Sequence, residues 1–223
     1  GIPAIEELTA RGVNVNITLL FSVARYEQVI DAYMAGLERR VTDGQPVDAI
    51  ASVASFFVSR VDTKADALLP PDSPLRGRLA IANAHRAYGR YRERFADERW
   101  EALAAAGARP QRPLWASTGT KDPTYSDVLY VEELIAADVV NTMPEATLRA
   151  FADHGQASHA LDESSAAAED ILRDAQAAGI DLAAITAQLE RDGVQSFCAS
   201  YDELIDRITT KTEATALTRD GFG

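Results

Sequence analysis

Cysteine is almost absent from the chain: its 223 residues include only one, Cys198. A single cysteine excludes an internal disulfide, and the sequence has neither a CxxC pair nor a His–Cys cluster that would bind a metal. Such scarcity is typical of a reducing compartment, so we expect a cytoplasmic protein. No apolar run approaches the roughly 20 residues of a membrane-spanning helix, and no signal peptide is recognisable. A membrane is therefore not an expected partner.

Positive charge is scarce as well. The sequence has 22 Lys and Arg against 34 Asp and Glu, a net charge of -12, and no cluster of basic residues. Nucleic acids and anionic membrane surfaces are therefore not expected partners, because both require clustered cations. A small anionic substrate is still compatible, since a few local cations suffice to bind it. With 47% apolar and 25% charged residues, the chain has the composition of a globular protein.

The most informative stretch is NVNITLLFS, residues 14–22, in which polar and apolar residues alternate. A period of two predicts a strand with one polar and one apolar face. The polar side holds Asn14, Asn16 and Thr18, and the apolar side holds Val13, Val15, Ile17 and Leu19. Helical patterns flank this strand, which indicates a parallel sheet covered by helices, with the polar side lining a barrel interior. An edge strand with one solvent-exposed face is the alternative that the pattern leaves open.

The order of strand and helix recurs along the chain. Strands are expected at residues 14–22, 50–59, 113–117 and 139–143, each followed by a helix, with Ser126 capping one that runs to residue 135. Residues 61–111 are expected to be a helical insertion, and residues 156–223 to form three closing helices. Four βα units are about half of a (β/α)8 barrel, which takes around 250 residues. We expect residues 1–223 to form one α/β domain, the C-terminal part of a TIM barrel, whose open edges are covered by a missing N-terminal half or by another subunit.

Two places along the chain have the residues that a phosphate group needs. Arg60 follows the second expected strand, and a Ser-Thr-Gly-Thr turn beginning at Ser117 follows the third, with Lys121 directly behind it. Hydroxyls and turn amides donate hydrogen bonds to a phosphate while a cation neutralises its charge. The pattern is moderately specific, because an isolated Arg60 or Lys121 at a strand end is also compatible with a solvated surface charge.

Four segments in order resemble transaldolases, in particular the longer bacterial type. They are GIPAIEELTARGVNVNITLLFS, ASFFVSRVDT, LWASTGTKDPTYSD and VVNTMPEATLRAFADHG, and the resemblance runs from residue 1 to about residue 211. It implies a (β/α)8 barrel of the class I aldolase type, without a cofactor, in the pentose phosphate pathway. Such an enzyme transfers a dihydroxyacetone unit between sugar phosphates, from sedoheptulose 7-phosphate and glyceraldehyde 3-phosphate to erythrose 4-phosphate and fructose 6-phosphate. The unit is carried on a lysine Schiff base.

The resemblance also implies roles for individual residues. Thr18 would hold the catalytic water, and Asn16 would bond to the substrate or to the Schiff-base lysine. Ser55 and Phe57 match positions beside the sugar chain, and Arg60 and Ser117 match positions at its phosphate group. Shorter family members carry an arginine where Thr118 and Gly119 stand here, so Lys121 is expected to supply the second positive charge, without the bidentate fork of an arginine.

The sequence departs from the family pattern in one serious respect. Its three lysines are Lys64, Lys121 and Lys211, and none matches the Schiff-base position, which we expect to precede Gly1. Two alternatives therefore remain beside a transaldolase. One is an enzyme like fructose-6-phosphate aldolase, which would release free dihydroxyacetone. The other is a non-catalytic half-barrel that binds sugar phosphates or docks on another subunit.

Overall fold

A four-stranded parallel sheet forms the centre of the computed structural model, which describes residues 1–158, 161 and 165–220. The strands are β1 (Val15–Leu20), β2 (Ser52–Phe57), β3 (Arg112–Ala116) and β4 (Val140–Asn141). Each pairs in parallel with the next in chain order. The prediction of an α/β chain with a parallel sheet is confirmed, although β4 is shorter than expected.

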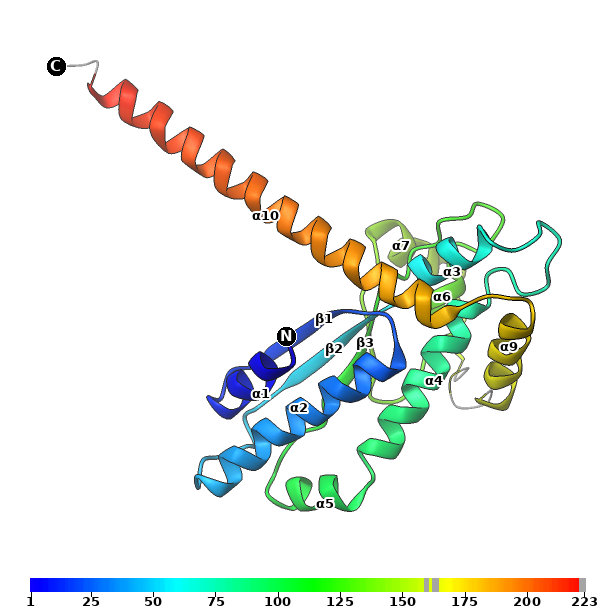
Figure 1. Ribbon diagram of the computed structural model, residues 1–223, viewed down its shortest axis with the longest axis horizontal. Helices are drawn as coiled ribbons and strands as arrows, with labels where there is room; N and C mark the ends of the chain where they lie inside the picture. The colour runs from blue at the N-terminus through cyan, green and yellow to red at the C-terminus, as the bar shows by residue number, and fades with distance from the viewer. Residues whose placement is uncertain (159–160, 162–164, 221–223) are drawn as a thin grey trace.

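Helix α2 (Val23–Thr42) packs on one face of this sheet (Figure 1). As the sequence predicts, Ser22 caps the helix, because its Oγ accepts a hydrogen bond from the amide of Arg25. Helix α1 (Ile2–Ala10) runs against α2, and the two backbones meet closely at Gly36. A Cβ atom added to Gly36 would lie 2.6 Å from the Cβ of Thr9, so only glycine permits this approach.

The core between the helices and the sheet is built on aromatic rings. Phe56 of β2 makes edge contacts with Tyr26 of α2 and with Trp115 of β3, at centroid distances of 6.2 and 6.1 Å. Helix α4 (Leu79–Arg94) and helix α5 (Glu98–Ala105) complete this layer. The buried indole of Trp115 donates from Nε1 to the carbonyl of Leu134, so its one polar atom is satisfied.

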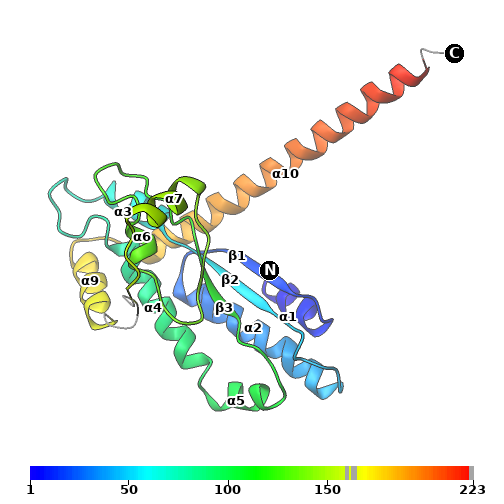
Figure 2. The same cartoon turned by 180° about the vertical axis from the view of Figure 1, so that it is seen from behind.

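Three shorter helices gather at the end of the sheet where the strands end: α3 (Ser59–Asp66), α6 (Leu129–Glu132) and α7 (Glu145–His154) (Figures 1 and 2). The expected helix from Ser126 to residue 135 was wrong. Val128, and not Ser126, is the N-cap residue of α6, which has only four residues. One reason is that the carbonyl of Leu134 bonds to the Trp115 side chain, so the chain is tied to the core directly after α6.

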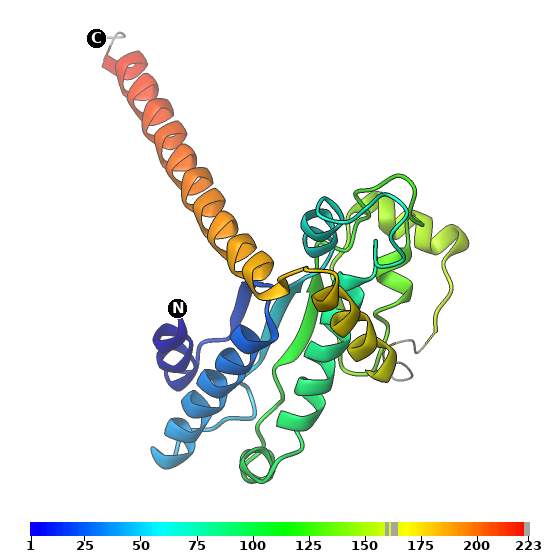
Figure 3. The same ribbon diagram turned by 45° about the vertical axis from the view of Figure 1, so that its right-hand side comes forward.

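The C-terminal region has two long helices in its described part, α9 (Ser165–Ala177) and α10 (Leu182–Asp220). The sequence predicts a break near Gly193, but α10 continues through it. Gly193 instead lies against Leu19, and a Cβ there would be 2.9 Å from Cδ2 of Leu19, so that side chain would have to move. Helix α10 then projects far from the body of the molecule (Figure 3). Its apolar residues Val194, Phe197, Tyr201, Leu204 and Ile208 are exposed.

None of the helices in the described residues has the length and apolar character required to cross a membrane.

Candidate functional site

The polar residues of β1 and β2 meet on the sheet face opposite α2. Asn16 pairs with Val53 in the register, which places Ser55 two residues further along on the same face. The hydroxyl of Ser55 donates to Oδ1 of Asn16 at 2.7 Å. Ser55 is buried and Asn16 is exposed, so this bond orients an accessible carboxamide and leaves its NH2 group to donate elsewhere on the open face.

Thr18 lies on the same exposed side of β1, directly before an irregularity in the strand. The register shifts between Ile17 and Leu20, and Leu19 adopts a left-handed backbone with φ of 60°. Because of this bulge, Leu19 and Leu20 are both buried instead of alternating. The bulge therefore ends the alternating polar pattern at Thr18.

Arg60 stands in the first turn of α3, directly after β2. Its guanidinium carbon lies 5.1 Å above the centroid of the Phe57 ring, which is the geometry of a cation–π contact. The side chain is exposed, and among the described residues it makes no ion pair within 4 Å. A positive charge is thus held by an aromatic ring at the C-terminal end of the strand.

Ser117 follows β3 and lies beside the start of α3. The Oγ atoms of Ser117 and Ser59 are 3.0 Å apart, and the amide of Ser59 donates to the carbonyl of Ser117. Ser117 has a φ of 57°, a left-handed conformation that few non-glycine residues adopt. The parallel pairing of β2 and β3 therefore continues past both strands and brings Ser117 next to the neighbour of Arg60.

Ser59 is a residue of this region that sequence reasoning missed. It occupies the position before Arg60 in SFFVSR, and its side chain is 1% exposed. The only signal in the sequence is its place between a buried strand and the arginine. Its contact with Ser117 spans 58 residues, so no local pattern reveals it.

The threonines of the expected phosphate turn are used differently from the prediction. The Thr118 hydroxyl is buried and lies 2.8 Å from the carbonyl of Thr142, and the Thr120 hydroxyl donates to the carbonyl of Ser126. Because these two hydroxyls bond to backbone carbonyls of the chain, the expectation that the hydroxyls of this turn all donate to a phosphate was wrong for Thr118 and Thr120. Lys121 is exposed, and within the described residues it forms no ion pair.

Two carboxylates on α3 are buried behind Arg60. Asp62 accepts hydrogen bonds from the amide of Ala80 and the hydroxyl of Tyr130, and Asp66 accepts from the amide of Gly77 and the hydroxyl of Tyr125. Burial raises the pKa of Asp62 to about 7, against the effect of the hydrogen bonds, which lower it. Among the described residues, no group of three His, Cys, Asp or Glu side chains is placed to hold a metal ion.

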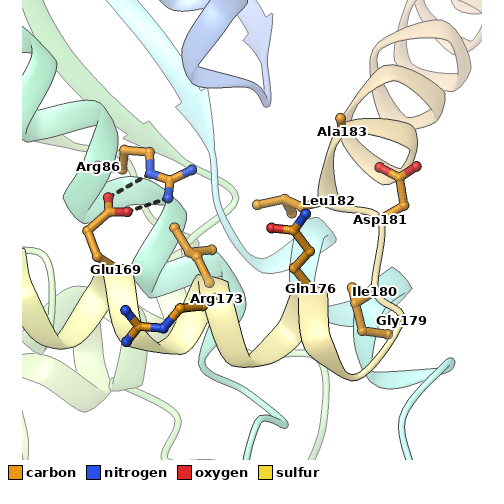
Figure 4. A pocket seen from close by; sticks show the side chains of 10 residues that line it. Arg86, Glu169, Arg173, Gln176, Gly179, Ile180, Asp181, Leu182 and Ala183 are labelled. Atoms are coloured by element: carbon orange, nitrogen blue, oxygen red, sulfur yellow. Dashed lines mark hydrogen bonds and ion pairs between the residues drawn. The ribbon is translucent and has the colours of Figure 1, made fainter.

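A cleft of about 670 Å³ lies away from this region, between α4, α9 and the start of α10 (Figure 4). Arg86, on its wall, donates two hydrogen bonds to Glu169, and Arg173 is paired with Asp170. Both cations are thus already neutralised by carboxylates. None of the residues expected from the sequence lines this cleft, so it is not the candidate site.

The fold and the site together define an α/β protein with a parallel sheet, in which polar residues and one arginine gather on the open face and at the strand ends. A family model described as Transaldolase/Fructose-6-phosphate aldolase matches residues 1–208. The chain belongs to this family.

Curated relatives agree with this assignment. The chain is 53% identical over 212 residues to the transaldolase of Saccharopolyspora erythraea, covering 93% of this chain and 58% of the relative. It is 50% identical over 214 residues to the transaldolase of Frankia alni, with the same two shares. With the transaldolase of Acidothermus cellulolyticus it shares 51% identity over 218 residues, 96% of this chain and 59% of the relative. The chain thus spans about three fifths of the length of the relatives it matches.

Proposed function

We propose that the chain is the sugar-phosphate-binding part of a transaldolase of the pentose phosphate pathway. The reaction transfers a dihydroxyacetone unit from sedoheptulose 7-phosphate to glyceraldehyde 3-phosphate, giving erythrose 4-phosphate and fructose 6-phosphate. The observation that carries the proposal is the grouping of Arg60, Phe57, Ser59 and Ser117 at one end of the sheet, in line with the exposed Asn16. A cation and a hydroxyl at one end and a carboxamide further along suit a phosphorylated sugar chain.

The phosphate group is assigned to Arg60 and Ser117. Arg60 provides the charge, and Phe57 holds its guanidinium over the ring while its N–H groups stay able to donate to a phosphate. Ser117 can donate its hydroxyl hydrogen to the phosphate when Ser59 is the donor in the contact between the two Oγ atoms, because each hydroxyl has a single O–H. Lys121, exposed on the following segment, adds a second positive charge near the phosphate.

The reacting end of the sugar is assigned to β1 and β2. Asn16, oriented by Ser55, donates its amide N–H to a substrate hydroxyl or to the Schiff-base lysine, and Thr18 holds the water that takes part in proton transfer. Ser55 and Phe57 line the sugar chain between the two ends. All four residues stand on one face of two neighbouring strands, which gives them a fixed spacing.

The Schiff-base lysine is proposed to lie in the part of the relatives that this chain does not match. A lysine nucleophile needs burial or a nearby cation to lower its pKa and keep it partly neutral. Lys64 is half exposed and lies 3.6 Å from Asp192, so it is neither buried nor beside a cation. Lys121 is exposed, and Lys211 lies on the projecting part of α10.

We further propose that the four strands are the later half of a (β/α)8 barrel in a single domain of residues 1–223. Residues 61–111 would be its helical insertion, and residues 156–223 the closing helices. The exposed polar residues of β1 and the exposed apolar side of α10 support this, because both are suited to contact further polypeptide, from the missing half or from another subunit. A cytoplasmic location is proposed from the single, exposed Cys198.

Complementation tests the proposal. The chain is co-expressed with the unmatched part of the Saccharopolyspora erythraea relative, and transfer from fructose 6-phosphate to erythrose 4-phosphate is measured. We expect activity in the pair and none in the chain alone, with a dihydroxyacetone adduct trapped by borohydride. Arg60→Ala should raise the KM for fructose 6-phosphate by about 10- to 100-fold, the loss of a charged contact of roughly 1.5–3 kcal/mol. Arg11→Ala, which removes an exposed arginine of the α1 C-terminus, is the matched control.

The outcomes separate the alternatives. Release of free dihydroxyacetone without an acceptor would favour an enzyme like fructose-6-phosphate aldolase. Binding of fructose 6-phosphate without any turnover in the complemented pair would favour the non-catalytic half-barrel. An unchanged KM in Arg60→Ala would refute the phosphate assignment.

A further inference from the structure

Residues 117–126 carry Ser117 and Lys121 but contain neither helix nor strand. Local bonds fold this segment on itself. The Thr120 hydroxyl donates to the carbonyl of Ser126, and Asp122 accepts from the amide and the hydroxyl of Thr124. These bonds shape the segment but do not fix its place relative to α3, which carries Arg60.

Asp66, at the last turn of α3, makes that longer connection. Its Oδ2 accepts a hydrogen bond of 2.8 Å from the hydroxyl of Tyr125, and its Oδ1 accepts from the amide of Gly77 at 3.1 Å. Arg76 adds a second path, since Nη1 donates to the Asp66 carbonyl and Nη2 lies 3.5 Å from a carboxylate oxygen of Asp122. The Asp66 side chain is therefore the meeting point of three parts of the chain.

The connection is stiff as well as specific. Asp66 and Arg60 belong to the same eight-residue helix, so displacement of one is transmitted to the other. The Tyr125 ring lies directly on the backbone of Gly77, where an added Cβ would be 2.9 Å from the ring. A charged acceptor strengthens the hydrogen bond from Tyr125 and sets its direction. The segment with Ser117 and Lys121 is thus tied by its far end to the helix with Arg60.

We propose that Asp66 is a positioning residue for phosphate binding, which acts through Tyr125 to hold residues 117–126 against the helix that carries Arg60. It touches no substrate. This inference rests on the proposed phosphate site but is separate from it, because it concerns how the phosphate-binding residues are held in position relative to one another. Without the tie, Ser117 stays beside Ser59, whereas the rest of the segment, including Lys121, loses its fixed distance from Arg60.

A purely structural role predicts something different. Tyr33 makes a comparable bond, from its hydroxyl to the carbonyl of Arg109 at 2.8 Å, far from Arg60. If the Tyr125 bond only stabilised the fold, its removal would lower the melting temperature without selecting between ligands, as removal of the Tyr33 hydroxyl should. A positioning role instead predicts a loss confined to phosphorylated ligands.

Tyr125→Phe removes the hydroxyl and keeps the ring, and Tyr33→Phe is the matched control. The dissociation constants for fructose 6-phosphate and for fructose are measured by calorimetry on the full chain, or on its complemented pair. We expect Tyr125→Phe to weaken fructose 6-phosphate binding by about three- to tenfold, the value of one hydrogen bond, and to leave fructose binding unchanged. The amides of residues 118–126 should exchange hydrogen faster in this variant, and those of α3 should not.

Equal affinities of Tyr125→Phe and the unsubstituted protein for fructose 6-phosphate would overturn the inference, as would a parallel loss for fructose. Failure of the proposed function looks different: the unsubstituted protein would not bind fructose 6-phosphate more tightly than fructose, or Arg60→Ala would not reduce that preference.

Discussion

Asp62 should make the stability of this protein fall as the pH rises through neutrality. Asp62 is 2% exposed, and burial raises its pKa to about 7, whereas an aspartate in the unfolded chain has a pKa of about 3.9. Between these two values the folded state holds a proton that the unfolded state has released. The contribution of this proton to stability is complete below about pH 4 and is lost as the pH rises through 7.

The size of the effect follows from the two pKa values. One pKa unit corresponds to about 1.4 kcal/mol, so the whole window amounts to roughly 4 kcal/mol. Between pH 5 and pH 8 the free energy of unfolding should therefore decrease by roughly 2.5 kcal/mol on account of Asp62. Asp62→Asn resembles the protonated form and does not titrate, so the variant should lack this decrease.

The assay is urea unfolding of both proteins at pH 5, 6, 7 and 8. Taking the difference between them at each pH cancels the titration of all other groups that the substitution leaves unchanged. Asp122→Asn is the control, because the Thr124 hydroxyl and amide lower the pKa of Asp122, and its difference from the unsubstituted protein should stay constant over this range. Parallel curves for Asp62→Asn and the unsubstituted protein would refute the reasoning.

Two further pairs of variants test the packing and the strain. Gly36→Ala should lower the free energy of unfolding by about 1–3 kcal/mol, because its Cβ would collide with Thr9. Gly89→Ala should raise the free energy of unfolding by up to about 1 kcal/mol, because nothing lies within 4 Å of the new atom. Urea unfolding measures both variants, and similar changes in the two would contradict the packing argument. Ser117→Gly should be about 1 kcal/mol more stable than Ser117→Ala, because glycine accepts the φ of 57°. Calorimetry should show both weakening fructose 6-phosphate binding equally, since both lose the hydroxyl; tighter binding by either would contradict the assignment of Ser117.

Local patterns in the sequence predicted most of the sheet. The alternation around Asn16 and Thr18 located β1, and Ser22 marked the start of α2, because both signals depend only on neighbouring residues. The break expected at Gly193 was wrong because that prediction also used only neighbouring residues. A glycine near the end of a helical pattern can mark a C-cap, but Gly193 lies inside α10 and packs against Leu19, which is far away in the sequence.

The site was predictable only in part. Arg60 and Ser117 could be singled out from their places after strands, but their surroundings depend on contacts between distant segments. Tyr125 and Asp66 are 59 residues apart, and neither has a pattern around it that indicates a hydrogen bond. The hydrogen-bond partner of the Thr118 hydroxyl could not be predicted either, because it is the carbonyl of Thr142, 24 residues further along the chain.

Two of the three described non-glycine residues with positive φ show how the fold shapes the site. Leu19 and Ser117 both have positive φ, and each lies near the end of a strand. Leu19 directly follows Thr18, which is assigned to the catalytic water, and Ser117 is itself assigned to the phosphate. Left-handed backbone at such residues costs roughly 1–2 kcal/mol and persists only where surrounding contacts impose it. Leu19 is held by burial against Gly193 of α10, and Ser117 by its bonds to Ser59. Contacts outside the phosphate-binding groups therefore set the direction in which the chain leaves β1 and β3.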